Sequence, residues 1–158
     1  MFTVGDMIVY ANSGVCKVEG ITKKFDKDCY ILDPLYEDGI IYVPVDTKLF
    51  MRKVITKEEA MALIDSIPDI DEEMCDETRS NDIKKFYSSL IDEHTLVGLV
   101  KTIKSVNNKN KARNKIGQVD RRYMKRAEQT LYGELACALD IPYEEIKTYV
   151  KKHLSQKN

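Results

Sequence analysis

The 158-residue sequence contains no tryptophan, two histidines and four cysteines. Neither the cysteines nor the two histidines, His94 and His153, cluster as metal ligands do, so we expect no metal site, no cofactor and reduced thiols. No apolar run approaches the roughly 20 residues that a membrane-spanning helix needs. The N-terminus shows no signal-peptide pattern. These absences predict a cytoplasmic protein that does not associate with membranes.

The motifs of common enzymes are also missing. The sequence has no G-x-x-x-x-G-K-[ST] phosphate loop and no G-x-S-x-G nucleophile elbow. The carboxylate pairs Glu58-Glu59 and Glu72-Glu73 are typical of a helix cap and a linker. We therefore expect a protein that is not an enzyme and takes no small-molecule substrate. Three classes stay open at this point: a regulatory binding protein, a general RNA-binding module, and an enzyme with an unfamiliar motif.

The first third of the chain is predicted to form short strands. Runs rich in β-branched and aromatic residues alternate with turn residues such as Asn12-Ser13-Gly14 and Glu37-Asp38-Gly39. The expected strands cover 7–10, 14–25, 29–34, 39–45 and 49–55. Pro44 lacks an N–H and should lie at a strand end or on an edge strand. Five short strands in about fifty residues indicate a small barrel or a strongly bent sheet.

The rest of the chain is predicted to be helical. Thr56 and Glu59 form a capping box for a helix that ends near Pro68. An acidic linker over 69–77 should follow. Helices are then expected over 81–90, 95–106 and 118–138, with a basic loop over 107–115 and a last helix that begins at Pro142. The fold class is thus α+β, with one domain over 1–55 and an all-helical domain over 56–158.

Charge is distributed unevenly along the chain. Residues 66–100 hold three basic and nine acidic residues, whereas residues 101–133 hold ten basic and two acidic residues. On a helical wheel, four of these basic residues share one face of the 118–138 helix, and apolar residues share the other. We call this face the basic stripe; it consists of Arg121, Arg122, Lys125 and Arg126. The preceding segment adds Lys109, Lys111, Arg113 and Lys115.

A merely solvated helix face would be expected to mix charges of both signs. Here the pairs Arg121–Lys125 and Arg122–Arg126 bring like charges together at i,i+4, which costs a few tenths of a kcal/mol each. That local cost favours an anionic partner, most often a nucleic-acid backbone. Alternatively, the acidic 69–77 segment neutralises part of this charge within the chain.

Three segments resemble one family. "FTVGDMIVYANSGVCKVEGI", "YILDPLYEDGIIYVPV" and "RRYMKRAEQTLYGELACAL" are similar, in order and spacing, to segments of CarD/CdnL-type bacterial transcription regulators. The resemblance implies a Tudor-like N-terminal domain that docks by its sheet on the β subunit of RNA polymerase. It also implies a helical domain that touches promoter DNA non-specifically at the upstream edge of the bubble and modulates open-complex stability. The protein would then be nucleoid-associated when bound to polymerase.

The resemblance also assigns residues. Lys24 and Tyr42 fall at docking positions of the sheet, where some members have an arginine in place of Tyr42, and Ile40 accompanies them. Arg121, Arg122 and Arg126 match basic positions of the DNA-facing helix. Many members insert a tryptophan wedge at the bubble edge, and Arg79 occupies that position in this chain.

Two other functions stay open. A Tudor-like adaptor would bind polymerase or another protein with little DNA contact. An RNA-binding accessory factor is disfavoured, because we expect no pair of exposed aromatic side chains at stacking positions.

Overall fold

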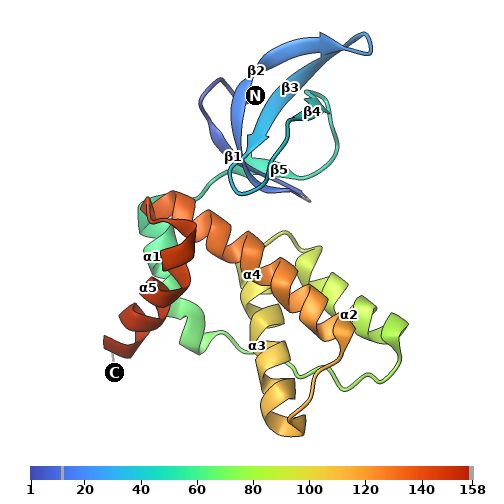
Figure 1. Ribbon diagram of the computed structural model, residues 1–158, viewed down its shortest axis with the longest axis vertical. Helices are drawn as coiled ribbons and strands as arrows, with labels where there is room; N and C mark the ends of the chain where they lie inside the picture. Colours follow the sequence, from blue (N-terminus) through green and yellow to red (C-terminus); the bar gives the residue numbers. More distant parts are fainter. Residues whose placement is uncertain (12, 157–158) are drawn as a thin grey trace.

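The computed structural model describes residues 1–11 and 13–156. Within these residues, five antiparallel strands form one sheet, and helices follow it along the chain (Figure 1). The strands are β1 (Met7–Tyr10), β2 (Gly14–Lys24), β3 (Lys27–Pro34), β4 (Ile41–Pro44) and β5 (Met51–Lys53). Of the predicted turn at Asn12-Ser13-Gly14, Asn12 lies outside the described residues.

The sheet is bent but open. Its strand order is β4-β3-β2-β1-β5, so that β4 and β5 are the two edges. Pro44 ends the edge strand β4, where its missing N–H costs no ladder hydrogen bond. The pairing of β2 with β3 shifts register between Val18 and Gly20, and a bulge of this kind bends a strand. The α+β fold class is confirmed, in the form of a bent sheet rather than a closed barrel.

The sheet carries its own small hydrophobic core. Side chains that alternate along β1 to β4 meet on one face of the sheet, as the period of two along a strand requires. This cluster consists of Ile8, Cys16, Val18, Tyr30, Leu32 and Val43. Phe2 packs on its edge, with its ring 5.9 Å from that of Tyr30.

The helices of the described chain are α1 (Lys57–Ser66), the 3₁₀ turn η1 (Ile67–Asp69), α2 (Ser80–Ile91), α3 (Leu96–Arg113), α4 (Gln118–Leu139) and α5 (Tyr143–Gln156). The capping box of α1 is present: the Thr56 hydroxyl accepts from the Glu59 amide, and the Glu59 carboxylate accepts from the Thr56 amide. The predicted basic loop over 107–115 is wrong. Helix α3 continues through Arg113, because Val106 and Lys109 are buried, and it ends at Asn114 in the left-handed conformation.

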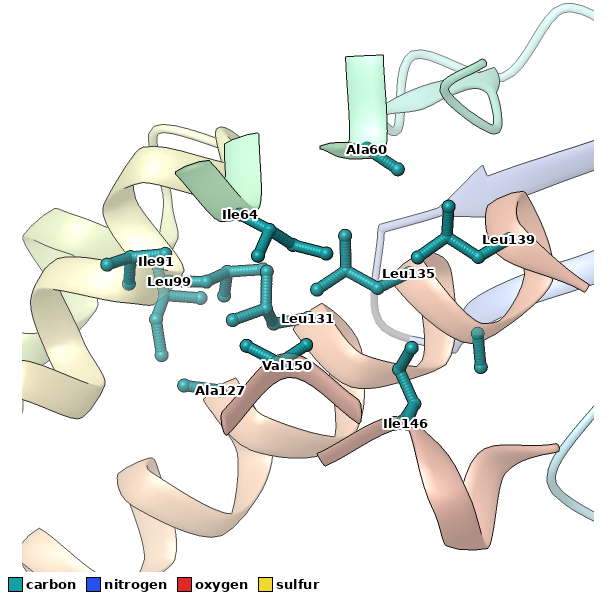
Figure 2. Packing of buried hydrophobic residues seen from close by; sticks show 12 residues of the cluster. Ala60, Ile64, Ile91, Leu99, Ala127, Leu131, Leu135, Leu139, Ile146 and Val150 are labelled. Atoms are coloured by element: carbon teal, nitrogen blue, oxygen red, sulfur yellow. The ribbon is translucent and has the colours of Figure 1, made fainter. Parts of the chain in front are cut away.

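Helix α4 is the centre of the helical part. Its buried face packs against α1, α3 and α5, and Figure 2 shows Leu131 and Leu135 among the side chains of Ile64, Ile146 and Val150. A second cluster, formed by Cys75, Ile83, Tyr87 and Val106, joins α2 to α3. Over the described residues, no helix is both long and apolar enough to cross a membrane.

Candidate functional site

Lys24 and Tyr42 meet on the sheet. Lys24 ends β2 and Tyr42 lies on the edge strand β4, with β3 between them. The Lys24 ammonium nitrogen is 3.7 Å from the centre of the Tyr42 ring, a cation–π contact worth about 0.5–1 kcal/mol at an exposed site. The structure therefore brings together two residues that the sequence assigned to docking, and the tyrosine ring holds a positive charge beside it.

Exposed apolar side chains extend this surface. Ile40 is 51% exposed and Phe25 is 87% exposed at the tip of the β2–β3 hairpin. Phe25 lies beside Lys24, whose ammonium is 5.8 Å from its ring centre. We call the set Lys24, Phe25, Ile40 and Tyr42 the sheet surface. Phe25 and Tyr42 thus both expose aromatic rings beside Lys24, and the expectation about pairs at stacking positions stays a prediction.

The basic stripe is exposed as its spacing predicted. Arg121, Arg122, Lys125 and Arg126 all face solvent, while Ala127 and Leu131 of the same helix are buried. Within the described part of the chain, none of the four forms an ion pair with an acidic side chain. The acidic residues of α4 have other partners: Asp120 pairs with Lys109, and Glu128 pairs with Lys147. The charge of the stripe is therefore uncompensated.

A buried polar cluster fixes the start of α4. The Asp120 carboxylate accepts from the Lys109 ammonium at 3.0 Å, from the Tyr87 hydroxyl at 2.6 Å and from the Gly117 amide at 2.9 Å. Burial alone would raise the pKa of Asp120, but these hydrogen bonds outweigh it and lower the pKa. The cluster thus joins α2, α3 and α4 one residue before Arg121.

The same cluster removes Lys109 from the predicted DNA-binding set. Lys109 is only 5% exposed, and its ammonium is committed to Asp120. A phosphate contact would require this buried pair to break, which typically costs several kcal/mol. The other members of the segment are solvent-exposed: Lys111 and Arg113 lie in the last turn of α3, and Lys115 lies between α3 and α4.

The acidic segment over 69–77 packs against α3 and is not a free linker; we call it the acidic strap. The Lys104 ammonium donates to the Ile70 carbonyl at 2.6 Å and the Ser105 hydroxyl to the Glu73 carbonyl at 2.5 Å. Cys75, in the same segment, is fully buried. Its carboxylates pair with α3: Glu72 with Lys104 at 3.7 Å and Asp76 with Arg113 at 3.3 Å. The strap therefore neutralises charge on α3 and leaves the basic stripe of α4 untouched.

Arg79 lies immediately before α2, at its N-cap position. Its backbone is extended, with φ −86° and ψ 136°, and its side chain is exposed. The side chain makes no cap hydrogen bond. Arg79 is thus at the start of the second α-helix of the helical part, as the resemblance implies, with a guanidinium that faces solvent.

One further set of contacts was not predicted: a junction between the sheet and α4. Glu134 is 1% exposed, and its carboxylate accepts from both terminal nitrogens of the Arg52 guanidinium, at 2.5 and 2.7 Å, and from the Ile55 amide at 3.0 Å. The Tyr36 hydroxyl donates to the Gly133 carbonyl at 3.0 Å. We call these contacts the Glu134 junction.

The junction borders a cleft between the sheet and the helices. The cleft has a volume of 570 Å³ and includes Tyr36, Arg52 and Glu134 in its lining. At one side Phe50 stacks on His94, with ring centres 4.6 Å apart and planes at 5°. Gly133-Glu134-Leu135-Ala136 belongs to the third segment that resembles the family, but no role was assigned to it from the sequence. The signal that could have revealed its role is a charged residue, Glu134, on the buried and otherwise apolar face of α4.

The His, Cys, Asp and Glu side chains of the described residues are dispersed. No group of three or more His, Cys, Asp or Glu side chains is arranged there to hold a metal ion. All four cysteines are free thiols, and burial raises the pKa of Cys16 to about 11. A thiol with a raised pKa is a poor nucleophile at neutral pH.

Comparison with known families identifies the N-terminal part. Residues 2–55 match the family model described as the CarD-like/TRCF RID domain. The matched domain points to a transcription-related protein that interacts with RNA polymerase. It supports the assignment of the chain to the CarD/CdnL type, on the residues that form the sheet and lead into α1. Among curated proteins, none matches the chain.

Proposed function

We propose that the protein docks by the sheet surface on the β subunit of RNA polymerase and lays the basic stripe of α4 along the backbone of promoter DNA near the upstream edge of the bubble. In this role it modulates the stability of the open complex and performs no catalysis. The observation that carries the DNA contact is the uncompensated charge of the stripe. The family match over residues 2–55 supports the polymerase contact.

The arrangement of the chain supports a division of labour. The sheet lies at one end of the molecule, and α4 runs from beneath it toward α2 and α3 (Figure 1). Arg121 to Arg126 lie in the N-terminal half of α4, and Glu134 lies in its C-terminal half. We propose a polymerase-interacting domain over 1–55 and a DNA-facing domain over 56–158. Tethering to polymerase would let weak phosphate contacts act at high effective concentration.

The proposal has two direct tests. The chain should co-purify with RNA polymerase and with its isolated β subunit. It should also bind duplex DNA of unrelated sequences with similar affinity, because phosphate contacts carry little sequence information. The affinity should fall as salt rises, with a log–log slope of about 0.9 per phosphate contact. Polymerase binding without salt-dependent DNA binding would instead favour the Tudor-like adaptor.

A further inference from the structure

The Glu134 junction is the main polar connection that the described residues make between the sheet and α4. Arg52 lies on β5 and reaches Glu134 of α4 with both terminal guanidinium nitrogens, in the two-pronged geometry that makes arginine–carboxylate pairs strong and directional. The same carboxylate accepts from the Ile55 amide, in the short connection between β5 and α1. One buried side chain thus binds both the edge of the sheet and the chain that leaves it.

A second contact meets α4 at the neighbouring residue. Tyr36, in the connection between β3 and β4, donates its hydroxyl to the Gly133 carbonyl and packs its ring on Tyr143, with ring centres 4.9 Å apart. A β-carbon at Gly133 would lie 3.1 Å from the Tyr36 ring, so glycine permits this close approach. Partial burial raises the pKa of Tyr36 to about 12. Like any tyrosine hydroxyl, it is protonated and can donate at neutral pH.

Both contacts end on the helix that carries the basic stripe. Gly133, Glu134 and the stripe belong to one continuous helix, Gln118–Leu139. At 1.5 Å per residue, the stripe begins about 12 Å and ends about 20 Å from Glu134 along the helix axis. Whatever fixes the sheet to residues 133 and 134 therefore also fixes the direction in which the stripe extends from the sheet.

We propose that Glu134 is a positioning residue that sets the orientation of the DNA-facing stripe relative to the polymerase-binding sheet. This inference rests on the proposed function. Glu134 itself touches neither partner. Its effect on binding is confined to the complex in which polymerase and DNA are engaged together, because only that affinity depends on the geometry between the two surfaces.

The test compares the native chain with Glu134→Gln, which keeps the size of the side chain and removes its charge. Residual dipolar couplings of backbone amides report the relative orientation of the sheet and α4 in the full chain. A single alignment tensor should fit both parts of the native protein, and two different tensors should be needed for E134Q. Chemical shifts away from the junction should be unchanged, which shows that each part keeps its fold.

Binding measurements then distinguish a positioning role of Glu134 from a purely structural one. E134Q should bind isolated polymerase and free duplex DNA like the native chain. Its affinity for a polymerase–promoter complex should fall by about tenfold, because the variant gains less from tethering. Glu128→Gln is the matched control, since Glu128 lies on the same helix and pairs with Lys147 of α5, within the helical part. Glu128→Gln should change neither the residual dipolar couplings nor the affinity for the polymerase–promoter complex.

The failures are distinguishable. A native chain that does not bind polymerase overturns the proposed function. Native binding together with an unchanged orientation in E134Q, or a changed orientation with unchanged ternary affinity, overturns the inference about Glu134 alone. If E134Q does not fold, Arg52→Lys replaces it, because lysine keeps the charge and loses the two-pronged geometry. The residual dipolar couplings and the affinity for the polymerase–promoter complex are then measured on Arg52→Lys, with the same expected results.

Discussion

The ammonium of Lys24 lies 3.7 Å from the centre of the Tyr42 ring, although the two residues come from strands separated by β3. The tyrosine thus restores, through its neighbour, some of the positive character that a family arginine would give at this position. A partner that meets the sheet surface encounters a cation framed by exposed aromatic and aliphatic side chains. Tyrosine is also a residue type enriched at protein interfaces.

The first prediction concerns this surface. Tyr42→Glu should weaken binding to the polymerase β subunit by at least about tenfold, since it places a charge in the interface and removes the ring beneath Lys24. The sheet should stay folded, because Tyr42 is 44% exposed. A pull-down with purified β subunit measures the effect. Val97→Glu, at an exposed position of α3, is the matched control; equal binding by both variants and the native chain would contradict the docking surface.

The second prediction concerns the basic stripe. Arg122→Glu combined with Arg126→Glu should weaken binding to duplex DNA by a similar factor for unrelated sequences. The salt slope should fall by about 0.9 for each phosphate that the variant no longer neutralises. Fluorescence anisotropy over a salt titration measures both quantities. Lys151→Glu with Lys152→Glu makes the same charge change on the exposed face of α5 and should have a smaller effect. Unchanged affinity and slope in the stripe variant would mean that the stripe is only a solvated face.

The third prediction concerns Arg79. We expect Arg79→Trp to lengthen the lifetime of open complexes on an unstable promoter, because stacking of an aromatic ring on a base contributes about 1–3 kcal/mol. Arg79→Ala should change the lifetime little. The nearby Asp76 carboxylate pairs with Arg113 rather than with the Arg79 guanidinium. Loss of activity in Arg79→Ala that tryptophan cannot restore would identify Arg79 as a DNA contact in its own right.

The fourth prediction concerns the pH dependence of stability. The pKa of Asp120 is lowered from its ordinary value of 3.8, so its carboxylate stabilises the fold above that pH. This stabilisation should be lost as the pH falls below 3.8 and the folded-state carboxylate becomes protonated. Asp120→Asn should lower the free energy of unfolding at pH 7 by about 3 kcal/mol, since it leaves the buried Lys109 ammonium without its counter-charge.

Urea denaturation at pH 7 and at steps below pH 5 measures this effect. Asp120→Asn should show a shallower loss of stability below pH 3.8 than the native chain, because the group that binds the extra proton is absent. Asp69→Asn, at an exposed position, serves as the control and should follow the native curve. Parallel acid profiles for Asp120→Asn and the native chain would contradict the assigned role of Asp120.

The elements that sequence reasoning located best are those with strong local signals. The Thr56 capping box, the turn at Gly39 and the two-faced pattern of 118–138 each depend on neighbours within a few residues, and the structure has all three. The sheet was also located, because β-branched runs alternate with turn residues. The sheet would be a closed barrel only if its edge strands, β4 and β5, paired with each other. The sequence of a single strand does not show whether they do.

The errors arose where distant residues decide local structure. Over 107–115 the apolar pattern fades, so a loop was expected; burial of Lys109 against Asp120 extends the helix instead. The acidic strap appeared to be a linker because its carboxylates are polar, yet α3 supplies the donors that hold it. The Glu134 junction was missed for the same reason, since its partners lie 79 and 82 positions away in sequence.

The length of α4 makes it a lever arm. The stripe ends about 20 Å from Glu134 along the helix axis, so a tilt of about 10° at the junction would move that end by about 3.5 Å. Successive base pairs of DNA are about 3.4 Å apart along each strand. A rotation too small to disturb the core of either part would therefore shift the stripe by a whole base-pair step. Small substitutions around Gly133 and Glu134 could in this way change where on a promoter the protein acts, without altering any residue that touches DNA.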